Sequence, residues 1–176
     1  MLPTNRKNPK LTPDPSLDFC VESLEDRQLL SASPLTPFDG DAVLYQVHSS
    51  GGSGQLSEIN VAEGTFTDLG ENAGFSINGV GYRTADNLIY GMEMSNDSLI
   101  RLGADGQYER LGAIEGLPNG SYYVGDFGHD GLLYVRHANT FYGINVDSVA
   151  VERTIQTTSS VSGIADVAYN LSLIHI

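Results

Sequence analysis

The stretch LSEINVAEGTFTDLG, residues 56–70, decides the fold because it reads as two short strands joined by a turn at Glu63-Gly64. Two later stretches have the same form: LIRLGADGQYERLG begins at residue 99 and FYGINVDSVAVERTI begins at residue 141. The three starts are 43 and 42 residues apart. A pattern that recurs at a fixed spacing indicates a repeated structural unit.

A second feature recurs with the same period. Small residues lead to an aromatic residue in INGVGYRTADNLIYGM, in YYVGDFGHDGLLYVRH and in SGIADVAYN. In the first two of these stretches a turn and another strand follow, so each period holds about four short strands, which is typical of a propeller blade. The sequence therefore predicts an all-β fold: an incomplete β-propeller of roughly three four-stranded blades, forming an open arc.

Burial explains why such units must be neighbours. A blade is a small twisted sheet, and only the adjacent blades can cover both of its faces. Small residues would permit close approach where the inner strands converge; these are Gly79, Gly81, Gly125 and Gly163. Aromatic side chains would fill the wedge between blades, although a ligand-stacking platform is the alternative; these are Tyr82, Tyr90, Phe127 and Tyr134.

The composition divides the chain near residues 34–40. Six of the seven prolines and both lysines precede Asp39, whereas all 20 glycines and all nine tyrosines lie from Gly40 onward. Proline disfavours regular structure, so a disordered leader with one short helix is expected at residues 1–38. The propeller repeat domain is expected at residues 39–170 and a non-native tail at residues 171–176.

The net charge of −13 excludes one class of partner. Beyond residue 33 the chain has five arginines against 17 carboxylates, and such a surface repels the phosphate backbone of nucleic acids. The acidic surface could attract cations or basic surfaces, or it could simply be a solvated shell. No apolar stretch is long enough for a transmembrane segment, which needs about 18 residues.

The leader carries a recognisable motif. In FCVESLEDRQLLSAS, residues 19–33, apolar side chains recur three to five residues apart and predict an amphipathic helix over residues 20–31. Residues 24–32 resemble the LEPR-XLL motif, an N-terminal signature of large secreted or surface proteins in bacteria, with Asp26 where proline often stands. The resemblance implies an extracellular or cell-surface destination. The alternative is a helix that only docks on the body.

The last six residues, LSLIHI, match none of the earlier repeat units. They equal the translation of CTGTCTCTTATACACATC, a transposase end sequence used to build sequencing libraries. We therefore expect residues 171–176 to be derived from an adapter and the natural protein to continue. The alternative is a genuine apolar strand.

The body also resembles a family. The run LYQV, GVGYRTADNLIYGM, LIRLGADGQYERLG, VGDFGHDGLLYV and ADVAYN is similar to a bacterial surface-associated repeat family classified as a domain of unknown function. The resemblance covers residues 42–170. It implies no established activity and no catalytic residue.

The sequence contains no strong motif for catalysis or for metal binding. The stretches at residues 104–106 and 128–131 resemble calcium loops, but they lack the alternating oxygen ligands, and Asp-Gly is typical of turns. Asp126 and Asp166 recur near the inner strands, where they could form a carboxylate ring in an axial channel or bond to backbone amides. The glycine-rich stretch at 51–54 lacks the lysine of a phosphate loop and is expected to be a flexible loop. The lone cysteine lies in the leader and the histidines show no metal-ligand spacing; these are Cys20, His48, His129, His137 and His175.

The sequence therefore predicts no catalytic, cofactor-binding or metal-binding residue and no cofactor. The favoured function is a noncatalytic extracellular or cell-surface repeat module for adhesion, scaffolding or recognition, within a larger exported bacterial protein and with an unknown protein or polysaccharide partner. The alternative is a propeller-type enzyme, a polysaccharide lyase or hydrolase, whose axial site needs residues from further blades.

Overall fold

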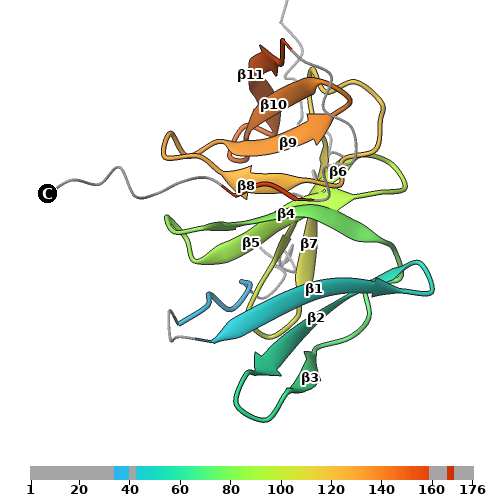
Figure 1. Ribbon diagram of the computed structural model, residues 1–176, viewed down its shortest axis with the longest axis vertical. Helices are drawn as coiled ribbons and strands as arrows, with labels where there is room; N and C mark the ends of the chain where they lie inside the picture. The colour runs from blue at the N-terminus through green and yellow to red at the C-terminus, as the bar shows by residue number, and fades with distance from the viewer. Residues whose placement is uncertain (1–33, 40–42, 159–165, 169–176) are drawn as a thin grey trace, which may run out of the picture. The chain divides into compact units, whose positions relative to one another are not determined.

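The computed structural model describes residues 34–39, 43–158 and 166–168, which form three antiparallel sheets (Figure 1). The chain divides into two compact units, residues 1–33 and 34–176. The first unit lies outside the described residues, and with it lie the helix predicted at residues 20–31 and the LEPR-XLL motif. None of the described residues forms a helix with the length and apolarity needed to cross a membrane.

The strands follow one another along the chain. The first sheet has the order β1-β2-β3, with β1 at Leu44–Ser50, β2 at Ser53–Asn60 and β3 at Thr65–Leu69. The second has the order β4-β5-β6-β7, at Ile77–Arg83, Leu88–Glu93, Ser98–Leu102 and Tyr108–Ala113. The third is formed by β8, β9, β10 and β11, at Gly125–Phe127, Leu133–His137, Thr140–Asn145 and Ala150–Gln156. The all-β fold of an incomplete, propeller-like array of three sheets is confirmed.

The three repeated stretches form three equivalent hairpins. They are β2–β3, β6–β7 and β10–β11, and each pair is antiparallel. The first hairpin turns where the sequence predicts, since the amide of Gly64 donates to the carbonyl of Asn60 over 2.9 Å and Gly64 has φ of 68°. A positive φ there is a conformation that glycine adopts without steric cost.

The first sheet departs from the prediction because it has three described strands, not four. The stretch at residues 34–39 does not supply the fourth. It contains two prolines, which cannot donate to a strand ladder. Its backbone bonds to loops of the second sheet instead: the amide of Phe38 donates to Asn87 over 2.8 Å, and the amide of Ala104 donates to Thr36 over 2.8 Å.

Two hydrophobic cores lie between neighbouring sheets. One joins the first and second sheets around Leu56 and Ile100, and the other joins the second and third sheets around Leu99 and Leu133. Leu99 and Ile100 are adjacent in β6 and enter different cores, because successive side chains of a strand point to opposite faces. The second sheet is thus covered on both faces, as the repeat model requires, and each fully buried leucine contributes about 2 kcal/mol.

Close approach of the inner strands is confirmed. Strands β4 and β8 face each other between the second and third sheets (Figure 1). A Cβ atom on Gly125 would collide with the backbone carbonyl of Gly79, and one on Gly81 would lie 3.1 Å from the Cα of Asp126. Only glycine permits this backbone contact. The fourth glycine of the prediction, Gly163, lies outside the described residues.

The aromatic prediction is right at two positions and wrong at one. Tyr90 and Phe127 are buried in the core between the second and third sheets, with ring centroids 5.7 Å apart in a T-shaped contact. Tyr82 is 39% exposed. It follows Gly81, which faces the third sheet, so the alternation of the strand turns Tyr82 to the opposite side. Tyr134 is half-buried and lies at a pocket.

Candidate functional site

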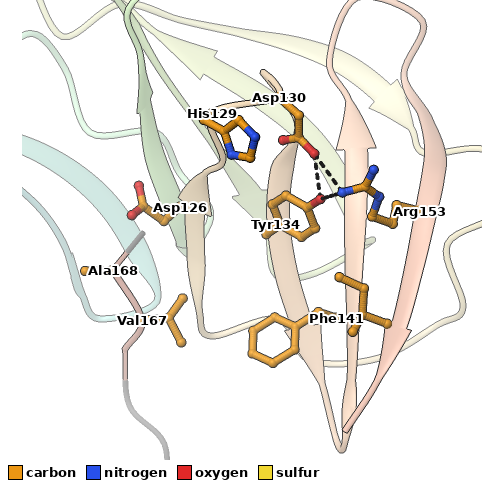
Figure 2. Close-up of a pocket in the computed structure, with 9 residues that line it drawn as sticks. Asp126, His129, Asp130, Tyr134, Phe141, Arg153, Val167 and Ala168 are labelled. Atoms are coloured by element: carbon orange, nitrogen blue, oxygen red, sulfur yellow. Dashed lines mark hydrogen bonds and ion pairs between the residues drawn. The ribbon is translucent and has the colours of Figure 1, made fainter. Parts of the chain in front are cut away.

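A pocket of about 350 Å³ lies against the third sheet, on the face turned away from the second (Figure 2). Its lining combines polar groups with an apolar floor: Asp126, His129, Asp130, Tyr134, Phe141, Arg153, Ile155, Val167 and Ala168. Phe141 and Val167 lie at the opposite end of the pocket from His129 and Asp130 (Figure 2). A few polar groups above an apolar floor are typical of a small ligand site.

A tight turn before β9 positions Asp130. The amide of Gly131 donates to the carbonyl of Gly128 over 3.0 Å, and Gly131 has φ of 78°. The amide of Leu132 donates to the Asp130 carboxylate over 3.4 Å. The stretch at residues 104–106 is also a turn, with Gly106 bonded to Gly103 over 3.0 Å. The interpretation of both Asp-Gly stretches as turns is confirmed.

Asp130 is the centre of a polar triad (Figure 2). The hydroxyl of Tyr134 donates to its Oδ2 over 2.8 Å, and Nη1 of Arg153 donates to the same oxygen over 3.0 Å. Nη1 of Arg153 also donates to the Tyr134 oxygen over 3.0 Å. Tyr134 comes from β9 and Arg153 from β11, so the triad spans the sheet.

The triad sets the protonation of its members. Burial alone would raise the pKa of the Asp130 carboxyl, but hydrogen bonds from Tyr134 and Leu132 and the charge of Arg153 outweigh it, so this pKa is lowered. Burial and the neighbouring Asp130 carboxylate raise the pKa of Tyr134. At neutral pH Asp130 is ionised and Tyr134 is protonated. The pKa values of both groups lie further from neutral pH than their ordinary values do.

The second sheet contains the same arrangement. The hydroxyl of Tyr90 donates to Oδ2 of Asp86 over 2.7 Å, and Nη1 of Arg83 donates to that oxygen over 3.1 Å. Here Tyr90 is 1% exposed, between the second and third sheets. The aspartate–tyrosine pair is thus a recurring part of the sheet, with the arginine supplied from a different strand in each case.

Arg83 also joins two sheets. Its Nη1 donates to Oδ1 of Asp147 over 2.8 Å, and its Nη2 donates to Oδ2 over 2.6 Å. Asp147 lies in the turn between β10 and β11 of the third sheet. Hydrogen bonding from Arg83 lowers the pKa of Asp147 and outweighs the opposing effect of burial. This two-pronged ion pair holds the second sheet against the third.

The two recurring aspartates bond to their own backbone. Oδ1 of Asp126 accepts from the amide of Phe127 over 2.9 Å, and Oδ1 of Asp166 accepts from the amide of Val167 over 2.8 Å. The interpretation of these residues as backbone-bonding groups is confirmed. Both also border one cavity of about 320 Å³, which adjoins the pocket through Asp126 and Val167.

The other candidates lie apart. His129 lines the pocket, His48 lies 3.6 Å from Asp68 in the first sheet, and His137 lies 3.3 Å from the amide of Ser121. Cys20 and His175 lie outside the described residues. Where the structure describes the chain, no three His, Cys, Asp or Glu side chains are grouped as metal ligands would be.

The glycine-rich loop is corrected by the structure. It was expected to be flexible, but Gly51 and Gly52 form the tight turn between β1 and β2, with φ of 61° and 86°. Ser53 and Gly54 begin β2, where the amide of Gly54 donates to Phe75 over 2.6 Å. Two positive φ angles suit a two-residue hairpin turn, which glycine supplies.

Sequence reasoning missed the aspartate–tyrosine pair. Its signal is the spacing Asp-x-x-x-Tyr, which occurs at Asp86–Tyr90 and at Asp130–Tyr134. The same spacing occurs at Asp41–Tyr45, although Asp41 lies outside the described residues. A tyrosine ring by itself predicts core packing and an aspartate beside glycine predicts a turn, so neither residue alone predicts the hydrogen bond between them.

Comparison with known proteins gives the family. Residues 43–175 match the family model described as a repeat of unknown function (DUF6923). No curated protein matches the chain in sequence. The match confirms the repeat domain expected at residues 42–170, whereas the adapter origin of residues 171–176 stays a prediction; the match extends over most of them.

Two solved structures are similar in fold. Both are virginiamycin B lyase from Staphylococcus aureus: a selenomethionine-substituted protein, with a TM-score of 0.43, and a catalytically inactive form with quinupristin, with a TM-score of 0.44. Each is 15% identical to this chain and is matched over 70% of this chain. The chain spans 44% of the length of either structure. By its sequence match, the chain belongs to the DUF6923 family of repeats of unknown function.

Proposed function

We propose that this chain is a noncatalytic module of an exported protein, and that it serves recognition or scaffolding through the faces of its sheets. The observation that carries the proposal is the protonation of the triad. The pKa of Asp130 is lowered and that of Tyr134 is raised, so neither group is poised to exchange a proton near neutral pH. General acids and bases work best with a pKa near the operating pH, so the directions of these two shifts do not suit Asp130 and Tyr134 to proton transfer.

The recurrence of the triad supports the same conclusion. The Asp86–Tyr90 pair has the same chemistry, and its tyrosine is buried between two sheets while the Asp86 side chain stays 30% exposed. A hydroxyl that is buried in a core and bonded to a neighbouring carboxylate has a structural role there. By equivalence, the Asp130–Tyr134 pair organises the face of the third sheet and positions its side chains for contact with a partner.

A protein or polysaccharide partner fits this face. Phe141 and Ile155 provide apolar area, and Arg153 and His129 provide polar contacts at its edge. Interfaces combine such an apolar centre with polar groups around it. Export is supported by the resemblance of residues 24–32 to a signature of secreted bacterial proteins.

An activity assay tests the noncatalytic part of the proposal. The whole chain is incubated with a panel of neutral and acidic polysaccharides, and unsaturated uronate ends and new reducing ends are measured. We expect product to form no faster than in buffer. The proposal is wrong if the chain forms product and Asp126→Ala or His129→Ala abolishes it, since the chain would then be a lyase or hydrolase with its site at this pocket.

A reporter fusion tests the destination. Residues 1–38 are joined to a reporter in a bacterial host, with Leu29→Asp/Leu30→Asp as the matched control for the motif. We expect the reporter outside the cytoplasm with the natural sequence and inside it with the control. Cytoplasmic retention of both fusions would contradict export.

A further inference from the structure

The sheets share a plan of apolar positions. In each sheet one row of three residues runs across three neighbouring strands at paired positions. The rows are Leu44, Ile59 and Phe66 in the first sheet, Ile89, Leu102 and Tyr108 in the second, and Leu133, Ile144 and Val151 in the third. We call each set the apolar row of its sheet. In the second and third sheets the apolar row packs against the preceding sheet.

The apolar row of the first sheet packs against no other sheet of the described chain. Leu44 is 52% exposed and Phe66 is 66% exposed, whereas the equivalent Leu133 of the third sheet is 0% exposed. Large apolar side chains that are grouped and exposed mark an interaction surface. Within the chain, each covered apolar row contacts side chains on the facing side of the preceding sheet, which is the side opposite to that sheet's own apolar row.

In the third sheet that opposite face meets no further sheet among the described strands, although Val167 and Ala168 border it. Tyr90 and Leu99 of the second sheet contact the sheet that follows, and their equivalents in the third sheet are Tyr134 and Phe141, which line the pocket of Figure 2. Ile155, paired with Phe141, is 44% exposed. The chain forms two internal interfaces, each between an apolar row and the opposite face of the preceding sheet. The apolar row of the first sheet and the pocket face of the third sheet are the two halves of an interface of this kind.

The hydrogen-bonding edge of β1 and the segment at residues 166–168 are also complementary. Among the described strands, β1 has a hydrogen-bonded neighbour on one side only, whereas its equivalents β5 and β9 pair on their other side with β4 and β8. Residues 166–168 share one feature with β8, although they are not a strand here: Asp166 accepts from the amide of Val167 as Asp126 accepts from that of Phe127. Among the described residues, the first sheet therefore has no inner strand, and residues 166–168 resemble one in sequence beyond the third sheet.

We propose that a second copy of this chain docks head to tail on the third sheet. The apolar row of its first sheet covers Tyr134, Phe141 and Ile155, and its β1 pairs with residues 166–168. Two such contacts related by a twofold axis bring together two sets of three sheets, about six in all, within the range of closed propellers. This deepens the proposed function by naming the partner of the same face, and it rests on that proposal.

Charge opposes this association. Each chain carries a net charge of −13, so two copies repel one another at low ionic strength. Added salt screens the repulsion and leaves the burial of apolar surface intact. The dimer is therefore stronger at high than at low ionic strength.

Sedimentation of the full chain tests the proposal. We expect a species of twice the chain mass of 18.9 kDa, with a dissociation constant that rises at least about tenfold in Phe66→Asp or Ile155→Asp. Val61→Asp is the matched control, because Val61 is 72% exposed in the β2–β3 turn and off the apolar row. Circular dichroism shows that each variant is folded.

Mixing the two variants separates this geometry from others. Phe66→Asp has an intact third-sheet face and Ile155→Asp has an intact first-sheet face, so the mixture recovers one of the two contacts and forms a heterodimer. A face that pairs with itself would not be rescued by mixing. A monomer at all concentrations, or a mixture no stronger than its components, overturns the proposal.

Cross-linking tests the strand pairing. In the third sheet Phe127 lies opposite Leu133, and the equivalent positions are Val167 and Leu44. With Cys20 replaced by serine, chains carrying Val167→Cys should form a disulfide with chains carrying Leu44→Cys, and not with chains carrying Val61→Cys. Equal cross-linking to both overturns the pairing. These experiments measure association and not activity. A negative result would overturn the dimer and leave the noncatalytic proposal to its own assay.

Discussion

The faces of the second and third sheets that carry Tyr90 and Tyr134 share one side-chain plan but differ in their surroundings. Tyr90 bonds to Asp86 and is 1% exposed, whereas Tyr134 bonds to Asp130 at an open pocket. Both tyrosines make the same hydrogen bond to an aspartate, but only Tyr90 is covered by a neighbouring sheet. The comparison teaches that a sheet of this repeat does not bury its own apolar face; the neighbouring sheet does.

We expect the largest difference in stability from truncating two equivalent apolar side chains, one of which is covered by a neighbouring sheet while the other is not. Leu99 is 0% exposed, and its equivalent Phe141 is half-buried at the pocket. We expect Leu99→Ala to lower the free energy of unfolding by about 3 kcal/mol and Phe141→Ala by about 1 kcal/mol, because only the first leaves a cavity in a sealed core.

Urea unfolding measures both changes. The measurement is made in the Phe66→Asp background, so that association of two chains does not cover Phe141. Equal losses for the two variants would mean that the third-sheet face is as well covered as the interface between the second and third sheets.

The next effect tests how closely those two sheets approach. We expect Gly125→Ala to lower the free energy of unfolding by about 2 to 3 kcal/mol, because the added carbon meets the backbone of Gly79, which cannot move aside without separating β4 from β8. Gly143→Ala is the control in the third sheet, since a Cβ there meets side chains at 3.1 Å and should cost about 1 kcal/mol. Thermal unfolding compares them, and a larger loss for the control would refute the close-approach account.

The smallest effect concerns the ion pairs. We expect a double-mutant cycle on Arg83 and Asp147 to give a coupling of about 1 kcal/mol, and one on Arg153 and Asp130 about 0.5 kcal/mol. The first pair bridges two sheets with two hydrogen bonds, and the side chain of Arg83 is 18% exposed. The second has a single hydrogen bond to its carboxylate, and the two pairs are comparably exposed, with Asp147 at 68% in the first and Arg153 and Asp130 at 55% and 23% in the second.

Acid should remove both couplings. The pKa values of Asp147 and Asp130 are lowered in the folded chain, so each carboxylate stabilises the fold fully above its unfolded pKa, about 3.9. This stabilisation is lost as the pH falls through the lower, folded pKa. Repeating the cycles in urea at neutral pH and below about pH 3 checks the sign, and couplings that grow in acid would contradict it.

Much of the fold could be predicted because its signals are local. The hairpin of residues 56–70 and its two repeats show alternating apolar residues and turn residues, and these patterns depend only on neighbours in the chain. The glycines of β4 and β8 were also predictable, since a strand rich in glycine is expected where backbones meet.

The candidate site was less predictable. Tyr82 and Tyr90 have similar sequence surroundings, yet the bulged pairing of β4 with β5 turns one to the surface and the other into a core. The triad of Asp130, Tyr134 and Arg153 joins two strands that lie 19 residues apart at their contacting side chains. A sequence separation of that kind carries no signal until the strand register is known.

By itself, the sequence determined the strands, the turns and the period of the repeat, because backbone conformation and side-chain alternation are set by near neighbours in the chain. Only the tertiary structure decided that the first described sheet has three strands, that Leu99 is sealed while Phe141 lines a pocket, and that the pKa of Asp130 is lowered. Burial and pKa depend on the groups that surround a side chain in space, and in this array those groups come from the adjacent strand or the adjacent sheet.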